Sequence, residues 1–166
     1  MLSNGTEAKV GTLGSKYEFF HEWKRLSEQE EGNVALETML RGICKKDNFL
    51  DLLENFISFD HSDGETVKIL ARNHQYLGVN EAVKAYEARK LNNGKLGVFW
   101  HTQGSGKSYS MVFLSQKIRR KFAGSPTIVI LTDRDELNTQ ISDTFENCGL
   151  LGLSLIHISE PTRRTP

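Results

Sequence analysis

A single stretch, VFWHTQGSGKS at residues 98–108, predicts the architecture of this chain. An apolar run ends there in a glycine-rich turn, and the turn closes in Gly-Lys-Ser where a helical pattern begins. A strand, a glycine-rich loop and a helix in this order are typical of the phosphate-binding loop of ATP- or GTP-binding proteins. The alternative is a chance turn rich in Gly and Ser, which the flanking patterns disfavour.

Each residue type in this loop has a physical role. Gly104 and Gly106 can adopt backbone angles that a side chain forbids, so consecutive N–H groups can point at phosphates. Lys107 is expected to reach the β- and γ-phosphates, and the Ser108 hydroxyl is expected to ligate Mg²⁺. His101 stands where the usual pattern has its first glycine, and the spacing of the motif is otherwise kept. The replacement limits which families of nucleotide-binding proteins the loop can belong to, but the loop is still predicted.

The residues after the loop predict a βαβ unit. Apolar side chains recur at helical spacing from residue 107 to Phe122, and residues 127–131 form a continuous apolar run suited to a strand buried on both faces. Strand, helix and strand in this order form a right-handed crossover in a parallel sheet. We therefore predict an α/β fold with the parallel sheet of P-loop (RecA-like) NTPases, incomplete here and preceded by a small, mainly helical segment.

A last helix is predicted after this unit, with Asp133 as its N-cap and Leu137, Ile141 and Phe145 along one side. Asp133 is a weaker candidate for the acid that holds Mg²⁺ through water, because it lies one residue past the expected strand tip. The cations at residues 117–121 suit the end of the preceding helix, with DNA contact as the alternative.

The residues before the loop are expected to form a structural scaffold rather than a functional site. Residues 33–44 show helical spacing of apolar side chains, and Asp47 is expected to cap a second helix whose apolar face carries Phe49, Leu50, Leu53, Phe56 and Ile57. Residues 59–64 are expected to form a loop at a domain boundary. The aromatic cluster at residues 17–23 is expected to pack in the core, with base stacking as the alternative.

Composition describes an ordinary globular chain. The 166 residues hold 21 Lys+Arg and 21 Asp+Glu, so net charge argues neither for nor against nucleic acid. Cys44 and Cys148 lack metal-ligand spacing and are expected to be reduced core thiols of a cytoplasmic protein. No stretch approaches the roughly 20 apolar residues that span a bilayer, so no membrane partner is expected.

Several motifs together resemble a known family. They are RNHQY at residues 72–76, WHTQGSGKS at 100–108 and TDR at 132–134, with NGTE at 4–7 and LDLLENF at 50–56 upstream. In this combination the chain resembles the restriction (R) subunit of type I restriction-modification enzymes, from residue 3 to about residue 149.

The resemblance implies a superfamily 2 helicase-like translocase that moves duplex DNA with ATP and Mg²⁺, beside separate modification and specificity subunits. It implies that Gln75 reads the adenine edge, as an amide can do bidentately, that Lys107 is the catalytic lysine, and that Thr132, Asp133 and Arg134 lie near DNA. The implied nucleotide-binding residues are Gln75, Thr102, Gln103, Gly104, Ser105, Gly106, Lys107 and Ser108.

This sequence departs from the family's motif set at both ends. It holds no Asp-Glu-x-His/Asp box downstream of the loop, and Glu7 with Lys9 match only part of a nuclease site. We therefore expect negligible ATPase activity and no DNA cleavage from this chain alone. A non-catalytic nucleotide-binding module, or a fragment of another P-loop ATPase or kinase, stays open as an alternative.

These patterns divide the chain into three segments. Residues 1–60 are expected to be the end of a nuclease region plus a helical linker, and residues 61–149 the first part of a RecA-like motor lobe. Residues 150–166 are expected to be a non-native tail, because they are similar to a translated sequencing adaptor and share no periodicity with the preceding helix. A basic DNA-binding tail is the alternative.

Overall fold

The computed structural model describes residues 1–33 and 35–150. Its strands are β1 (Leu2–Ser3), β2 (Ala8–Val10), β3 (His21–Glu22), β4 (Ile57–Asp60) and β5 (Val67–Leu70). Its α-helices are α1 (Leu36–Met39), α2 (Lys46–Asn55), α3 (Asn73–Glu87), α4 (Lys107–Lys121) and α5 (Asp135–Asn147). The predicted tail from residue 151 onward lies outside the described residues.

The N-terminal segment is less helical than predicted, because it begins with the antiparallel sheet β1–β2–β3. Ala8 and Val10 of β2 are buried, and the following Trp23 is almost fully buried against Tyr76 of α3 at a ring separation of 5.3 Å. The predicted packing role of the aromatic cluster therefore holds for Trp23. It was wrong for Tyr17 and Phe19, whose side chains are exposed.

The predicted pair of helices is present, with a short π-helix at Leu40–Cys44 joining α1 to α2. Met39 and Ile43 are buried, as their spacing predicted, whereas Cys44 is exposed and not a core thiol. Asp47 lies in the first turn of α2 and makes no cap, since the N-cap residue is Lys45.

The predicted apolar face of α2 was wrong in part. Phe56, just past the helix, is fully buried, but Phe49, Leu50 and Leu53 are each about half exposed. The buried side of α2 instead carries Leu52 and the polar Asn55. A face that mixes apolar and polar residues is not selected by hydrophobic periodicity alone.

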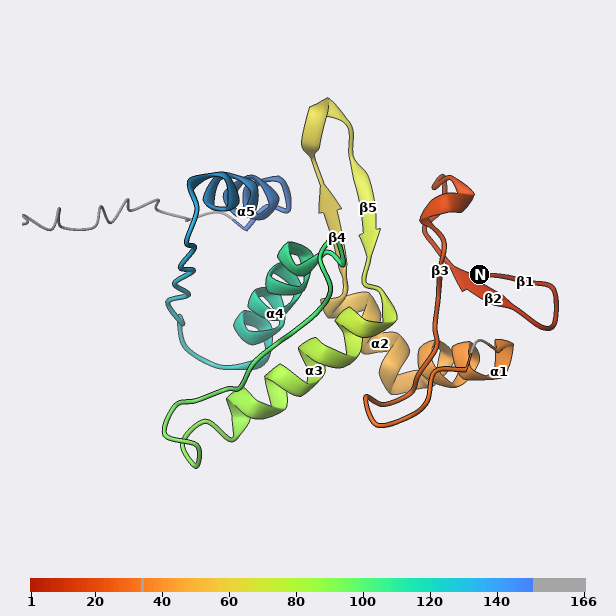
Figure 1. Ribbon diagram of the computed structural model, residues 1–166, viewed down its shortest axis with the longest axis horizontal. Helices are drawn as coiled ribbons and strands as arrows, with labels where there is room; N and C mark the ends of the chain where they lie inside the picture. Colours follow the sequence, from red (N-terminus) through yellow and green to blue (C-terminus); the bar gives the residue numbers. More distant parts are fainter. Residues whose placement is uncertain (34, 151–166) are drawn as a thin grey trace, which may run out of the picture.

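A β-hairpin links the scaffold to the second half of the chain. β4 and β5 pair antiparallel, with Ile57 opposite Leu70 and Asp60 opposite Val67, so residues 57–60 are strand rather than the start of a loop. The hairpin spans the predicted domain boundary. α3 and α4 lie side by side beneath it, and α5 packs on α4 and β4 (Figure 1).

The predicted parallel sheet does not form within residues 1–33 and 35–150, where both sheets are antiparallel. Residues 95–100 and 127–131 are extended loop, and Val129 and Leu131 are 74% and 80% exposed instead of buried on both faces. A strand of a parallel sheet is held by hydrogen bonds to neighbouring strands. Neither segment has such a neighbour in the described part of the chain.

The two predicted helices around this second segment are present. α4 begins at Lys107 as predicted and buries Val112, Phe113 and Ile118, although Met111 points more to solvent. In α5, Phe145 is buried against Val112. Asp133 was wrongly predicted as the cap of α5, because the N-cap residue is Arg134.

No helix among the described residues is long and apolar enough to cross a bilayer.

Candidate nucleotide-binding site

The glycine loop enters α4 with left-handed backbone angles. Gly104 has φ 75° and Gly106 has φ 80°, and Gly106 is the N-cap of the 15-residue α4. A residue with a side chain is strained in this region, so both glycines are required by the geometry. The first N–H groups of a helix have no partner within it and carry partial positive charge. The loop therefore presents the kind of helix end that binds anions.

The Lys107 side chain lies over the start of the loop. Its Nζ donates to the backbone carbonyl of His101 at 2.5 Å and to that of Thr102 at 3.1 Å. Since Lys107 is exposed, an incoming phosphate oxygen can compete for the N–H groups of its ammonium. Ser108 is half-buried in the first turn of α4, one residue further along.

One buried polar atom of the loop, the Ser105 hydroxyl oxygen, indicates whether these residues suit a nucleotide with Mg²⁺. Among the described residues, Ser105 Oγ is buried and has no hydrogen-bond partner. A buried hydroxyl without a partner is costly, and a phosphate oxygen would satisfy it. With Lys107 as the cation and Ser108 as a hydroxyl ligand, the donor set suits a nucleotide triphosphate and its Mg²⁺.

Gln75 lies beside the loop, as its predicted role requires, but its amide is already bonded. Oε1 accepts from the Arg72 backbone N–H at 2.8 Å, and Nε2 donates to the Gly106 carbonyl at 2.9 Å. The side chain is only 3% exposed. Gln75 thus caps the start of α3 and holds the loop, a role that sequence reasoning missed.

Aromatic rings join the loop to α3. The His101 ring lies 4.8 Å from that of His74 and 4.5 Å from that of Phe99. His74 Nε2 is also 3.0 Å from the Ser105 carbonyl oxygen. Gly78 lets Phe99 approach the helix, because a Cβ there would overlap the Phe99 ring. Sequence reasoning noted His101 only as a replaced glycine and did not identify His74.

The loop borders two cavities. One, of about 750 Å³, is lined by Gly104, Ser105 and Gly106 together with Gln75 and Arg72. The other, of about 760 Å³, is lined by His101 and Thr102, and Arg72 borders it too. Gln103 is exposed at the tip between these segments. Both volumes are in the range of small-molecule sites.

The predicted DNA-contacting residues lie elsewhere. Thr132, Asp133 and Arg134 precede α5 and line neither cavity of the loop. Asp133 is exposed and lies 3.8 Å from the Arg134 guanidinium, so it is not brought to the loop as a Mg²⁺ ligand.

Comparison with known proteins decides the family. The sequence model of the SWI2/SNF2 ATPase family matches residues 74–162 of this chain. The chain belongs to the SWI2/SNF2 ATPase family.

This ATPase chain is also similar to curated type I restriction enzyme subunits. It is 36% identical over 89% of its length to the type I restriction enzyme HindI endonuclease subunit of Haemophilus influenzae. It is 28% and 33% identical to the putative type I restriction enzyme MjaIXP and MjaVIIIP endonuclease subunits of Methanocaldococcus jannaschii, over 100% and 74% of its length. The resemblance predicted from the motifs is therefore confirmed. The chain spans 15%, 18% and 12% of the lengths of these relatives.

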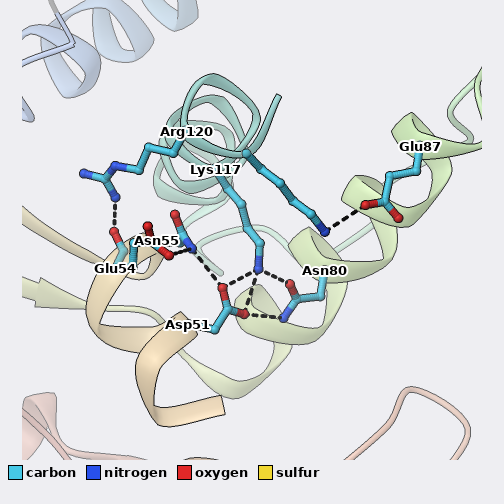
Figure 2. Close-up of polar contacts among 8 residues, drawn as sticks. Asp51, Glu54, Asn55, Asn80, Glu87, Lys117 and Arg120 are labelled. Carbon is cyan, nitrogen blue, oxygen red and sulfur yellow. Dashed lines mark hydrogen bonds and ion pairs between the residues drawn. The ribbon is translucent and has the colours of Figure 1, made fainter. Parts of the chain in front are cut away.

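A polar cluster at the far end of α4 holds the SWI2/SNF2 ATPase chain together. Lys117 Nζ donates to both carboxylate oxygens of Asp51 in α2, at 2.5 and 2.7 Å, and to Asn80 Oδ1 in α3 at 2.6 Å. Lys121 pairs with Glu87 of α3 at 2.8 Å, and Arg120 donates to the Glu54 carbonyl (Figure 2). Three of the cations for which the sequence left a helix C-terminus or a DNA contact open, Lys117, Arg120 and Lys121, thus bind within the chain.

The sequence carried a weak signal for this cluster. Lys117 lies four residues after Phe113, so it shares the buried face of α4. A cation on the apolar face of a helix needs a partner, but no sequence pattern identifies Asp51, which is 66 residues away.

The remaining candidate metal ligands do not lie close together in the described residues. Among residues 1–33 and 35–150, no group of three or more His, Cys, Asp or Glu side chains could hold a metal ion. Glu7 is exposed beside β2, and Lys9 lies over the Tyr17 ring. The partial nuclease motif therefore has no convergent acidic ligands here.

Proposed function

We propose that residues 102–108 with Gln75 bind ATP and Mg²⁺. The observation that carries the proposal is Gly106, left-handed at the N-terminus of α4, with Lys107 directly after it. In this site the loop N–H groups and Lys107 would hold the phosphates, and Ser108 would ligate Mg²⁺. Bound Mg²⁺ would neutralise phosphate charge during γ-phosphoryl transfer.

We further propose that the chain is a fragment of a type I restriction R subunit. Similarity to curated endonuclease subunits over most of the chain supports this. The family match at residues 74–162 supports a motor lobe in the second half of the chain, for which we propose residues 61–149. We propose residues 1–60 as the end of a nuclease region with its linker. In the whole protein, duplex DNA and the modification and specificity subunits would be partners in the cytoplasm, with residues 132–134 near DNA.

We propose that the Gln75 amide also binds the adenine base. Its amide uses one N–H and one oxygen lone pair within the protein, and the amide inventory leaves one of each. Because Gln75 also holds the loop, adenine binding and loop geometry would be coupled through one side chain.

Nucleotide titration tests the proposed site. We expect the chain to bind a fluorescent ATP analogue with Mg²⁺, and Lys107→Ala to weaken binding by about tenfold or more, as expected for loss of a charge-assisted phosphate contact. Lys90→Ala, at an exposed position outside both loop cavities, is the matched control. Equal binding by wild type and Lys107→Ala would contradict the proposal. Gln75→Ala should reduce the preference for ATP over GTP.

A non-catalytic nucleotide-binding module is the second candidate. Asp133, the acid nearest the loop in sequence on its C-terminal side, lines neither cavity. We therefore propose that this chain alone binds ATP without appreciable turnover or DNA cleavage. Phosphate release at saturating ATP, with and without duplex DNA, separates this candidate from an active ATPase.

A further inference from the structure

Two consecutive carbonyl groups of the glycine loop are held by neighbouring side chains of α3. The Ser105 carbonyl oxygen lies 3.0 Å from His74 Nε2, and the Gly106 carbonyl oxygen accepts from Gln75 Nε2 at 2.9 Å. Both donors stand in the first turn of α3. The loop is thus fixed to one helix at two successive peptide groups.

Fixing these carbonyls also fixes the direction of the loop N–H groups. In a trans peptide the C=O and N–H point to opposite sides of the peptide plane, and the described chain contains no cis peptide. The Ser105 carbonyl shares its peptide with the Gly106 N–H, and the Gly106 carbonyl shares its peptide with the Lys107 N–H. Both N–H groups are therefore aimed away from α3.

The His74 ring is itself held in place. It packs against His101 at 4.8 Å, and His101 packs against Phe99, which lies on Gly78 one turn further along α3. Rings held in this way lose little further freedom when the Nε2–H···O bond forms. The residue that replaces the usual first glycine thus supports the histidine that anchors the end of the loop.

We propose that His74 is a positioning residue of the phosphate loop. With its proton on Nε2, it donates to the Ser105 carbonyl and so orients the Gly106 N–H toward the phosphates. It acts through the loop backbone and not on the nucleotide. Its effect on ATP binding rests on the proposed function above, whereas its effect on loop order does not.

Three variants isolate the hydrogen bond. His74→Phe keeps a flat ring beside His101 but has no donor, whereas His74→Gln places an amide N–H near the position of Nε2. His61→Phe is the matched control, because His61 is exposed and bonds Thr66 instead of the loop. Far-UV circular dichroism of each variant checks that the helices are retained.

The first measurement needs no nucleotide. Backbone ¹⁵N order parameters of residues 104–108 in the whole chain should fall in His74→Phe, return toward wild type in His74→Gln and stay unchanged in His61→Phe. Unchanged loop order in a folded His74→Phe would overturn the proposal. If His74→Phe does not fold, low loop order in His74→Gln equal to that of a His74→Ala variant would overturn it.

The second measurement is the dissociation constant for ATP with Mg²⁺. Loss of one hydrogen bond should weaken binding by about fivefold in His74→Phe, with recovery in His74→Gln. Wild-type affinity in His74→Phe would count against the role. If wild type binds no nucleotide, the proposed function fails, and the order parameters still decide the role of His74.

Discussion

Lys117 and Asp51 are 66 residues apart, yet the Lys117 ammonium lies 2.5 Å from Asp51 Oδ1. The two side chains are 7% and 22% exposed, so this ion pair is largely removed from water. Burial lowers the pKa of Lys117, and the Asp51 carboxylate acts in the opposite direction. The pair joins the helix that starts at the glycine loop to the helix that precedes the hairpin.

Breaking this pair should destabilise the fold. Lys117→Met leaves the Asp51 carboxylate without its cation, at an expected cost of about 3 kcal/mol in the free energy of unfolding, the lower end of the range for buried pairs because Asp51 keeps some exposure. Urea denaturation measures this cost. Lys84→Ala removes the exposed Lys84–Glu81 pair and should cost about 0.5 kcal/mol.

The double variant Lys117→Met with Asp51→Leu provides a second comparison. It should recover part of the lost stability, because no unpaired charge remains. A double variant that is less stable than Lys117→Met would contradict the explanation.

Gly78→Ala should destabilise the chain through Phe99. The new Cβ would overlap the Phe99 ring, and overpacking of this kind costs about 1–3 kcal/mol, from which the better helix propensity of Ala returns about 1 kcal/mol. Combining Gly78→Ala with Phe99→Leu should restore part of the loss in thermal denaturation. Gly32→Ala is the control, because its Cβ meets only ordinary contacts, and it should change stability by about 0.5 kcal/mol or less. A higher melting temperature in Gly78→Ala, as helix propensity alone would give, would contradict the packing.

The folded chain should lose stability in mild acid because of two histidines. Burial lowers the pKa of His21 and that of His101 below the ordinary value of 6.5, and His74 lowers that of His101 further. Between the lowered pKa and 6.5, the unfolded chain binds more protons than the folded chain. Stability should therefore fall as pH decreases below about 6.5.

The melting temperature between pH 7.5 and 5.0 measures this effect. His101→Gln and His21→Gln should each give a shallower dependence than wild type. Parallel curves for wild type and both variants would show that other groups cause the loss.

The two cysteines should differ in reactivity. Cys44 is exposed, whereas Cys148 is buried, and burial raises the pKa of the Cys148 thiol. Because the thiolate is the reactive form, iodoacetamide at pH 7.5 should modify Cys44 about tenfold or more faster than Cys148. Peptide mass spectrometry follows both sites, and in urea the two rates should converge. Faster modification of Cys148 in the native chain would contradict its placement.

Local patterns predicted the helices and the loop well. The Gly-Lys-Ser turn gave the start of α4, and the helical spacing in residues 33–44 correctly predicted that Met39 and Ile43 are buried. The strand at residues 127–131 was wrong because a strand depends on neighbours, whereas a helix satisfies its own hydrogen bonds. The buried face of α2 was wrong because two polar residues lie on it: Asn55 bonds Asp51 within the helix, and Asp51 pairs with Lys117, 66 residues away.

The sequence by itself determined the glycine-rich loop, the helix after it and the family, because these depend on residues adjacent in the chain. Only the tertiary structure decided that Lys117 binds Asp51, that Gln75 and His74 hold the loop, and that Asp133 stays away from it. The reason is physical. A backbone turn and a helix are set by local sterics and spacing, but the partner of a buried charge or donor is set by how separate helices pack.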